Sequence, residues 1–112
     1  AATLRGNPQI VFVQVQGHAD ERGDDDHNLQ LTRDRSASVV RALVERGVER
    51  QRVQPAGYGE RCPVARGHNE AAWSQNRRVV FLILRTNSGP TNVRVACDNA
   101  RDLIPDEYND RE

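Results

Sequence analysis

The stretch IVFVQVQGHAD, residues 10–20, decides the fold. Residues 10–15 form a β-branched run with partial alternation, which predicts an interior strand. The strand runs into Gly17, and Asp20 places a carboxylate just beyond its end. A polar loop crowded with acids follows, and then comes the stretch NLQLTRDRS, residues 28–36. The pattern predicts a strand, an acidic loop and a helix in direct succession.

The helix is expected from Leu29 to about Arg46, with Gly47 as its C-terminal stop. Positions that recur every four residues share one helical face, and here they are Leu31, Arg35, Val39 and Leu43. Three of these are aliphatic, so Arg35 is expected at a buried position, where a guanidinium needs an anionic partner. We expect Asp20 to be that partner. A fixed acid and a fixed base side by side suit a ligand that carries both an ammonium and a carboxylate.

Further elements follow along the chain. Residues 52–58 predict a second strand, and Pro55 within it favours a sheet edge or a bulge. Strand, helix and strand at this spacing predict a right-handed βαβ unit. Residues 78–84 are nearly continuous in apolar character, so we expect a third strand that is buried on both faces. Trp73 is expected to plug the edge of the core. Shorter elements are expected at 70–73 (a helical turn), 92–96 (a strand) and 99–104 (a helix).

The 112 residues are enough for one domain. We expect this domain at residues 9–86, the end of an upstream element at 1–8, and a polar, acidic tail at 87–112 that is either disordered or loosely docked. The formal net charge is zero and only 4% of residues are aromatic, so the sequence predicts no nucleic-acid partner. No apolar run is long enough to span a bilayer, so membrane attachment would need an anchor outside this sequence.

Two cysteines and one acidic run bear on metal and redox chemistry. Cys62 and Cys97 lack the close pairing of a zinc site, which leaves one disulfide or two free buried thiols as open interpretations. The run at residues 24–27 lacks the alternating oxygen ligands and the glycine of a calcium loop. Solvated loop charge is the simpler interpretation, and we expect no metal site.

Four motifs in register resemble the OmpA-like domain, the peptidoglycan-binding module of outer-membrane porins, lipoproteins and flagellar stators. The matching stretches, spread over residues 8–85, are GHAD at 17–20, Asn28 with LTRDRS at 31–36, GYGE at 57–60 and NRRV at 76–79. The resemblance implies an α+β fold, an α/β sandwich with a βαβ unit, a mixed sheet and helices on one face. The family's domain begins with an additional strand and helix, and we expect both to be missing here.

The resemblance also implies a function without catalysis and without a cofactor. Asp20 would take the ammonium of the diaminopimelate in the peptidoglycan stem peptide, and Arg35 would take its carboxylate. Asn28 would shape the pocket, and the segment of Arg77 and Arg78 would add a polar contact, with Arg78 favoured. The domain would tie an envelope protein to the cell wall in the periplasm of a Gram-negative bacterium, associated with the outer membrane. The sequence leaves the oligomeric state open.

Other interpretations stay open from the sequence. Ala19 stands where the family usually has threonine, which points to weaker binding or to an assembly domain that has lost wall binding. An Asp20–Arg35 bridge could simply pin the loop, and Asn28 could simply cap the helix. A metal-dependent hydrolase would use His18, Asp20 and His27, but no nucleophile with an orienting base stands out.

Overall fold

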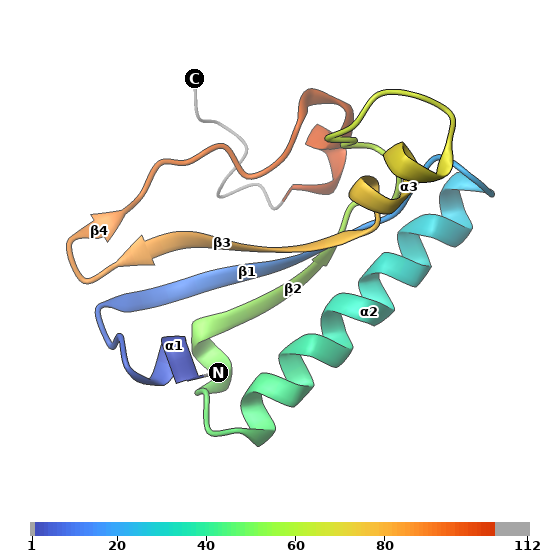
Figure 1. Ribbon diagram of the computed structural model, residues 1–112. Coiled ribbons are helices and arrows are strands. Elements are labelled where there is room, and N and C mark those ends of the chain that lie inside the picture. The colour runs from blue at the N-terminus through green and yellow to red at the C-terminus, as the bar shows by residue number, and fades with distance from the viewer. Residues whose placement is uncertain (1, 105–112) are drawn as a thin grey trace.

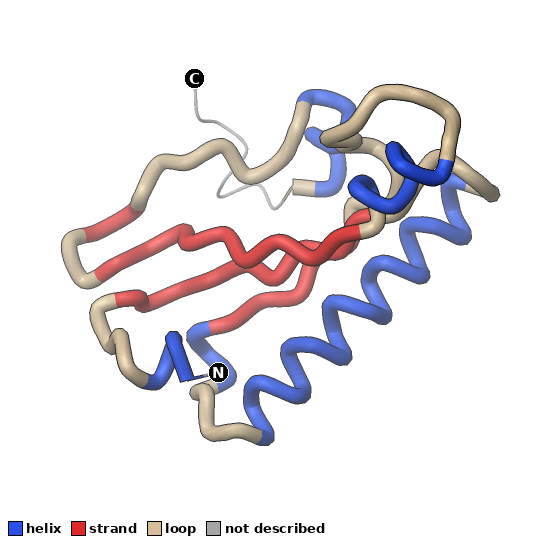
Figure 2. The backbone as a smooth tube through the Cα atoms, viewed as in Figure 1, coloured by secondary structure: helices blue, strands red, loops and turns tan. Residues whose placement is uncertain are grey.

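The computed structural model describes residues 2–104, which fold as a mixed sheet with one long helix against it (Figures 1 and 2). Along the chain the elements are α1 (Ala2–Arg5), β1 (Ile10–His18), α2 (Asp25–Glu45), the 3-10 helix η1 (Arg50–Arg52), β2 (Val53–Gly57), α3 (Glu70–Asn76), β3 (Arg78–Thr86), β4 (Gly89–Pro90) and the 3-10 helix η2 (Asp98–Leu103). The order of strands in the sheet is β2-β1-β3-β4. This architecture confirms the predicted α+β class.

The βαβ unit is present as predicted. Strands β1 and β2 pair in parallel, with Val15 opposite Pro55, and α2 connects them. Strand β3 lies on the other side of β1 and runs antiparallel to it, with Phe81 opposite Val15. Pro55 is tolerated because β2 lies at the edge of the sheet and pairs with β1 alone.

Helix α2 begins at Asp25, four residues before the predicted start at Leu29. The Asp24 side chain accepts a hydrogen bond from the backbone N–H of His27 and so caps the helix. Two further acids lie in the first turn, where the positive end of the helix dipole stabilises them. The acidic run that we read as solvated loop charge therefore starts the helix, and Asn28 is not its cap.

The face that α2 buries differs from the predicted one. Its buried residues are Asn28, Leu29, Thr32, Ser36, Val40 and Leu43, and Arg35 is exposed beside them. The reason lies in the strands: a Cβ on Gly17 would lie 2.5 Å from the backbone oxygen of Thr32, and a Cβ on Gly57 would lie 2.4 Å from the backbone nitrogen of Arg33. Backbones this close admit only small side chains between them, so Thr32 and Ser36 fill the contact and the larger Arg35 does not.

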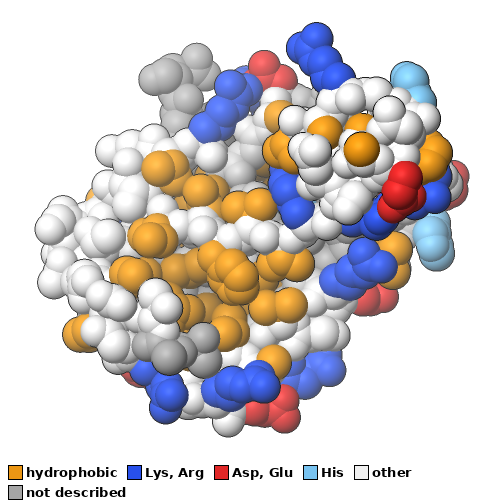
Figure 3. Space-filling view, in the orientation of Figure 1, with side chains coloured by type: hydrophobic (Ala, Val, Ile, Leu, Met, Phe, Trp, Pro, Cys, Tyr) orange, Lys and Arg blue, Asp and Glu red, His pale blue; other side chains and the backbone are white. Residues whose placement is uncertain are grey.

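Strand β3 is not buried on both faces, contrary to the prediction. Val79, Phe81 and Ile83 alternate along it on one face, and all three are exposed, with Phe81 at 53%. Helix α2 packs on β1 and β2, so it does not cover this part of the sheet face. Apolar side chains gather over the strands in the space-filling view (Figure 3).

The segment after β4 crosses the opposite face of the sheet (Figure 1). A disulfide joins Cys97 to Cys62, which decides between the two interpretations left open by the sequence. Val95 and Ala100 are buried against a core that includes Tyr58. Residues 93–104 are therefore not the disordered or loosely docked tail that we expected, and residues 105–112 of that tail lie outside the described residues.

Two of the three short elements form as predicted. The turn expected at 70–73 extends to the helix α3, and the helix expected at 99–104 is the 3-10 helix η2. The strand expected at 92–96 does not form, because this segment packs through side chains and contributes no ladder to the sheet. Within residues 2–104 no helix is long and apolar enough to cross a bilayer.

Candidate functional site

Asp20 lies just beyond β1, and two arginines donate the four hydrogen bonds that its carboxylate accepts. Its Oδ1 accepts from the backbone N–H of Arg22 at 2.9 Å and from Arg22 Nε at 3.2 Å. Its Oδ2 accepts from Arg22 Nη2 at 2.8 Å and from Arg77 Nη1 at 2.9 Å. The hydrogen bonds from Arg22 hold the pKa of Asp20 far below its usual range, and Arg77 adds to this effect. The carboxylate is therefore charged at any physiological pH.

Arg77 and Arg78 point to different places: Arg77 is the C-terminal cap of α3, and Arg78 is the first residue of β3. Arg77 bridges Asp20 and Glu70, whose carboxylate is 2.7 Å from Arg77 Nη2. Arg78 lies across the strands from His18 and donates to the backbone oxygen of Cys62 at 3.0 Å. Burial lowers the pKa of Arg78. The arginine that contacts Asp20 is thus Arg77, whereas the resemblance favoured Arg78.

Arg35 does not bridge to Asp20. No ion pair joins Arg35 to any acid within the described part of the chain, so its guanidinium is uncommitted. It lines a small hollow of about 130 Å³ at the end of the sheet, whose other walls are Gly17, His18, Arg77, Arg78 and Val79. Arg77 links the hollow to Asp20, because it lines the hollow and donates a hydrogen bond to the Asp20 carboxylate. Three arginines and no acid line this hollow, which favours an anion there, and Arg35 is the one whose guanidinium is not already bonded to Asp20, Glu70 or the Cys62 carbonyl.

Asn28 and Ala19 build the loop around Asp20 and do not line the hollow. The Asn28 side chain is buried and donates to the backbone oxygen of Arg22 at 3.0 Å and to Glu60 at 3.2 Å. Ala19 is buried, and its backbone N–H donates to the oxygen of Gly59 at 2.8 Å. These three contacts hold the chain in place on either side of Asp20.

Arg22, which holds Asp20, was missed in the sequence, and Trp73 was expected as a plug over the core edge and not as a stacking platform. The Arg22 guanidinium carbon lies 4.3 Å from the centroid of the Trp73 ring, a cation–π geometry. Trp73 is thus a platform for a cation and not only a plug over the core edge. The available signal was an arginine two residues after Asp20, within reach of the same carboxylate.

His18 points away from Asp20 into a buried polar row on the opposite face of the sheet. Its Nε2 lies 3.2 Å from Gln16 Oε1, and its Nδ1 has no hydrogen-bond partner. Burial, together with the charge of Arg78, lowers the pKa of His18 to about 4. Within residues 2–104 no three His, Cys, Asp or Glu side chains come together in a way that could hold a metal ion.

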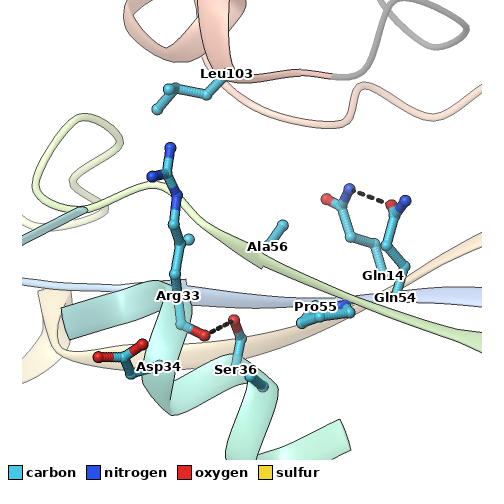
Figure 4. Close-up of a pocket in the computed structure, with 10 residues that line it drawn as sticks. Gln14, Arg33, Asp34, Ser36, Gln54, Pro55, Ala56 and Leu103 are labelled. Carbon is cyan, nitrogen blue, oxygen red and sulfur yellow. Dashed lines mark hydrogen bonds between the residues drawn. The ribbon is translucent and has the colours of Figure 1, made fainter. Parts of the chain in front are cut away.

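A larger hollow of about 420 Å³ lies at the edge strand β2, and its lining shares no residue with the small hollow beside Arg35. Gln14 and Gln54 meet there through a hydrogen bond of 3.0 Å, and the Arg33 side chain extends toward Leu103 (Figure 4). None of the expected ligand-binding residues lines this hollow.

Sequence comparison matches most of this chain to a known family and to named proteins. The family model described as the OmpA family matches residues 1–77. The peptidoglycan-associated lipoprotein of Pseudomonas aeruginosa is 43% identical over 79 residues, which are 70% of this chain and 46% of that protein. The protein of the same name from Pasteurella multocida is 41% identical over 81 residues, which are 72% of this chain and 53% of that protein. The chain thus spans about half the length of these relatives.

Solved structures show the same fold. The crystal structure of the peptidoglycan-associated lipoprotein from Burkholderia pseudomallei matches with a TM-score of 0.67 and 40% identity, over 72% of this chain and 68% of that one. The C-terminal domain of Helicobacter pylori MotB matches with a TM-score of 0.64 over 72% of this chain and 64% of that one. At 22% identity, the second match supports only the assignment of the fold.

Proposed function

Because this chain belongs to the OmpA family, we propose that its domain binds peptidoglycan non-covalently through the diaminopimelate of the stem peptide. The domain would tie an envelope protein to the cell wall in the periplasm of a Gram-negative bacterium, in association with the outer membrane. The names of the relatives, which refer to peptidoglycan, support this proposal.

The uncommitted guanidinium of Arg35 is the observation that carries the proposal. It stands beside Arg77 at one hollow, so a carboxylate placed there would lie next to the Arg35 guanidinium, whose planar fork suits paired hydrogen bonds, and next to the Arg77 side chain. Arg77 is itself held by Asp20, which lies outside the lining of the hollow. A ligand whose carboxylate enters the hollow would present an ammonium on the neighbouring carbon toward Asp20. Diaminopimelate has this arrangement of charges.

The test is co-sedimentation of the protein with purified sacculi. We expect Arg35→Ala to lower the affinity roughly tenfold or more, because charge-assisted hydrogen bonds contribute about 1.5–3 kcal/mol. Arg35→Lys should retain part of the binding, since lysine keeps the charge and loses the planar fork. Arg41→Ala is the matched control: Arg41 is an exposed arginine of the same helix that does not line the hollow. If Arg35→Ala sediments like the parent, the site is misassigned.

One observation favours a second candidate, an assembly domain that no longer binds the wall. Every hydrogen-bond position on the Asp20 carboxylate is occupied by the protein's own arginines. Titration with meso-diaminopimelate separates the two candidates: a saturable heat or chemical-shift change supports binding, and its absence favours the assembly domain.

A further inference from the structure

The hydrogen-bond positions of Asp20 are saturated before any ligand arrives. A carboxylate offers about four lone-pair sites, and Asp20 accepts four hydrogen bonds, three of them from Arg22 and one from Arg77. The side chain of Asp20 is only 7% exposed, so the remaining approach to it is narrow. A ligand ammonium can therefore reach this carboxylate only if one of the two guanidinium groups gives way.

Arg22 is the group that can give way. Its side chain is 51% exposed and lies on the loop before α2, whereas that of Arg77 is 34% exposed and is also held by Glu70 at 2.7 Å. Release of the Arg22 side chain vacates one site on each Asp20 oxygen, while its backbone N–H and Arg77 keep the carboxylate in place. The Trp73 ring, 4.3 Å from the guanidinium carbon, provides a face on which the displaced cation can stay.

We propose that Arg22 is an internal competitor for the ligand's ammonium at Asp20 and sets how strongly the site prefers a zwitterion to a plain dicarboxylate. The proposal rests on the proposed function. Ligand binding replaces one cation on Asp20 with another. The free energy of binding is therefore reduced by the free energy needed to release Arg22. A dicarboxylate without an ammonium gains nothing from that exchange. It would bind at Arg35 with Arg22 still in place.

Calorimetric titration of the chain and its variants with meso-diaminopimelate and with pimelate, the same dicarboxylate without ammonium groups, tests the proposal. Arg22→Ala should bind diaminopimelate roughly fivefold to tenfold more tightly than the parent, since it removes a competing pair with one buried partner. Its affinity for pimelate should stay the same or fall, because a positive charge is lost. Arg22→Lys keeps a competing cation and should stay closer to the parent. Arg66→Ala removes an exposed arginine elsewhere and should change neither affinity.

A second readout follows the side chain itself. In the NMR spectrum of the parent, the Nε–H signal of Arg22 should move toward that of a solvent-exposed arginine as diaminopimelate saturates the site. Pimelate should leave this signal unchanged. A role of Arg22 in folding alone would not produce this difference between the two ligands.

The outcomes separate this proposal from the proposed function. Weaker or unchanged binding of diaminopimelate by Arg22→Ala, with binding by the parent intact, overturns the competitor role alone. An Arg22 signal that does not respond to diaminopimelate does the same. Absence of binding by the parent and by Arg22→Ala overturns the proposed function and the competitor role with it.

Discussion

Acidification from pH 7 toward pH 4 should destabilise this domain through His18. The side chain is only 4% exposed, its Nδ1 has no hydrogen-bond partner, and Arg78 lies directly across the strands. Burial and the nearby positive charge lower its pKa from 6.5 to about 4. Between these two values the unfolded chain binds a proton at this position and the folded chain does not.

The sign and the size follow from this difference. Because the unfolded state holds more protons in this window, stability falls as the pH falls from about 6.5 to about 4 and then levels off with respect to His18. The full effect is about 3 kcal/mol, and about 2 kcal/mol of it should be lost by pH 5. Asp20 acts in a lower window: its folded pKa is depressed, so its contribution is lost only as the pH falls below about 4.

The assay is urea unfolding at a series of pH values from 4.5 to 7.5 (roughly the window in which His18 acts), followed by the fluorescence of Trp73. The matched variant is His18→Gln, which does not titrate and keeps a polar side chain beside Gln16. The free energy of unfolding of the parent should fall relative to that of the variant as the pH is lowered. Parallel curves for the two proteins, or an NMR titration that gives His18 a pKa above 6, would refute the reasoning.

Three further substitutions test the packing that positions the site. Gly17→Ala should destabilise by roughly 1–3 kcal/mol in chemical denaturation, because the new Cβ would lie 2.5 Å from the Thr32 backbone oxygen; an unchanged midpoint would contradict the close contact. Replacing both Cys62 and Cys97 with serine should lower the free energy of unfolding by about 4 kcal/mol and cancel the effect of a reductant on the parent; equal stability would refute it. Asn76→Ala should cost roughly 2–3 kcal/mol, since this buried amide accepts from two loop N–H groups and donates to one loop carbonyl; a melting temperature within error of the parent's would exclude that role.

Strands β1, β2 and β3 could be predicted because each is marked by a local pattern of apolar and β-branched residues. The β-branched run at 10–15 and the apolar run at 78–84 both lie within strands, and Pro55 correctly indicated an edge. The burial of β3 could not be predicted, because an apolar run does not tell which part of a sheet a single helix covers. The disulfide stayed open for a similar reason: spacing alone does not bring two cysteines together.

The structure shows where the predicted site residues lie, and their contacts differ from the expected ones. Arg35 shares the hollow with Arg77, but its assignment to a buried face failed because Thr32 and Ser36 were not counted as interface residues. The sequence offers no rule that ranks Thr and Ser above Leu31 on a helix face; only the glycines of the facing strands explain it. Arg22 was missed although its contact with Asp20 is local, two residues along the chain; only its contact with Trp73 depends on the tertiary fold. The roles toward a ligand stay predictions for all six expected residues: Asp20, Arg35, Asn28, Ala19, Arg78 and Arg77.

The most direct measurement is a structure of this domain with meso-diaminopimelate bound. The account predicts one ligand carboxylate within hydrogen-bond distance of the guanidinium groups of Arg35 and Arg77, an ammonium on Asp20, and the Arg22 side chain turned away. A ligand seated elsewhere, such as the hollow beside β2, with Arg35 untouched and Arg22 still on Asp20, would contradict it.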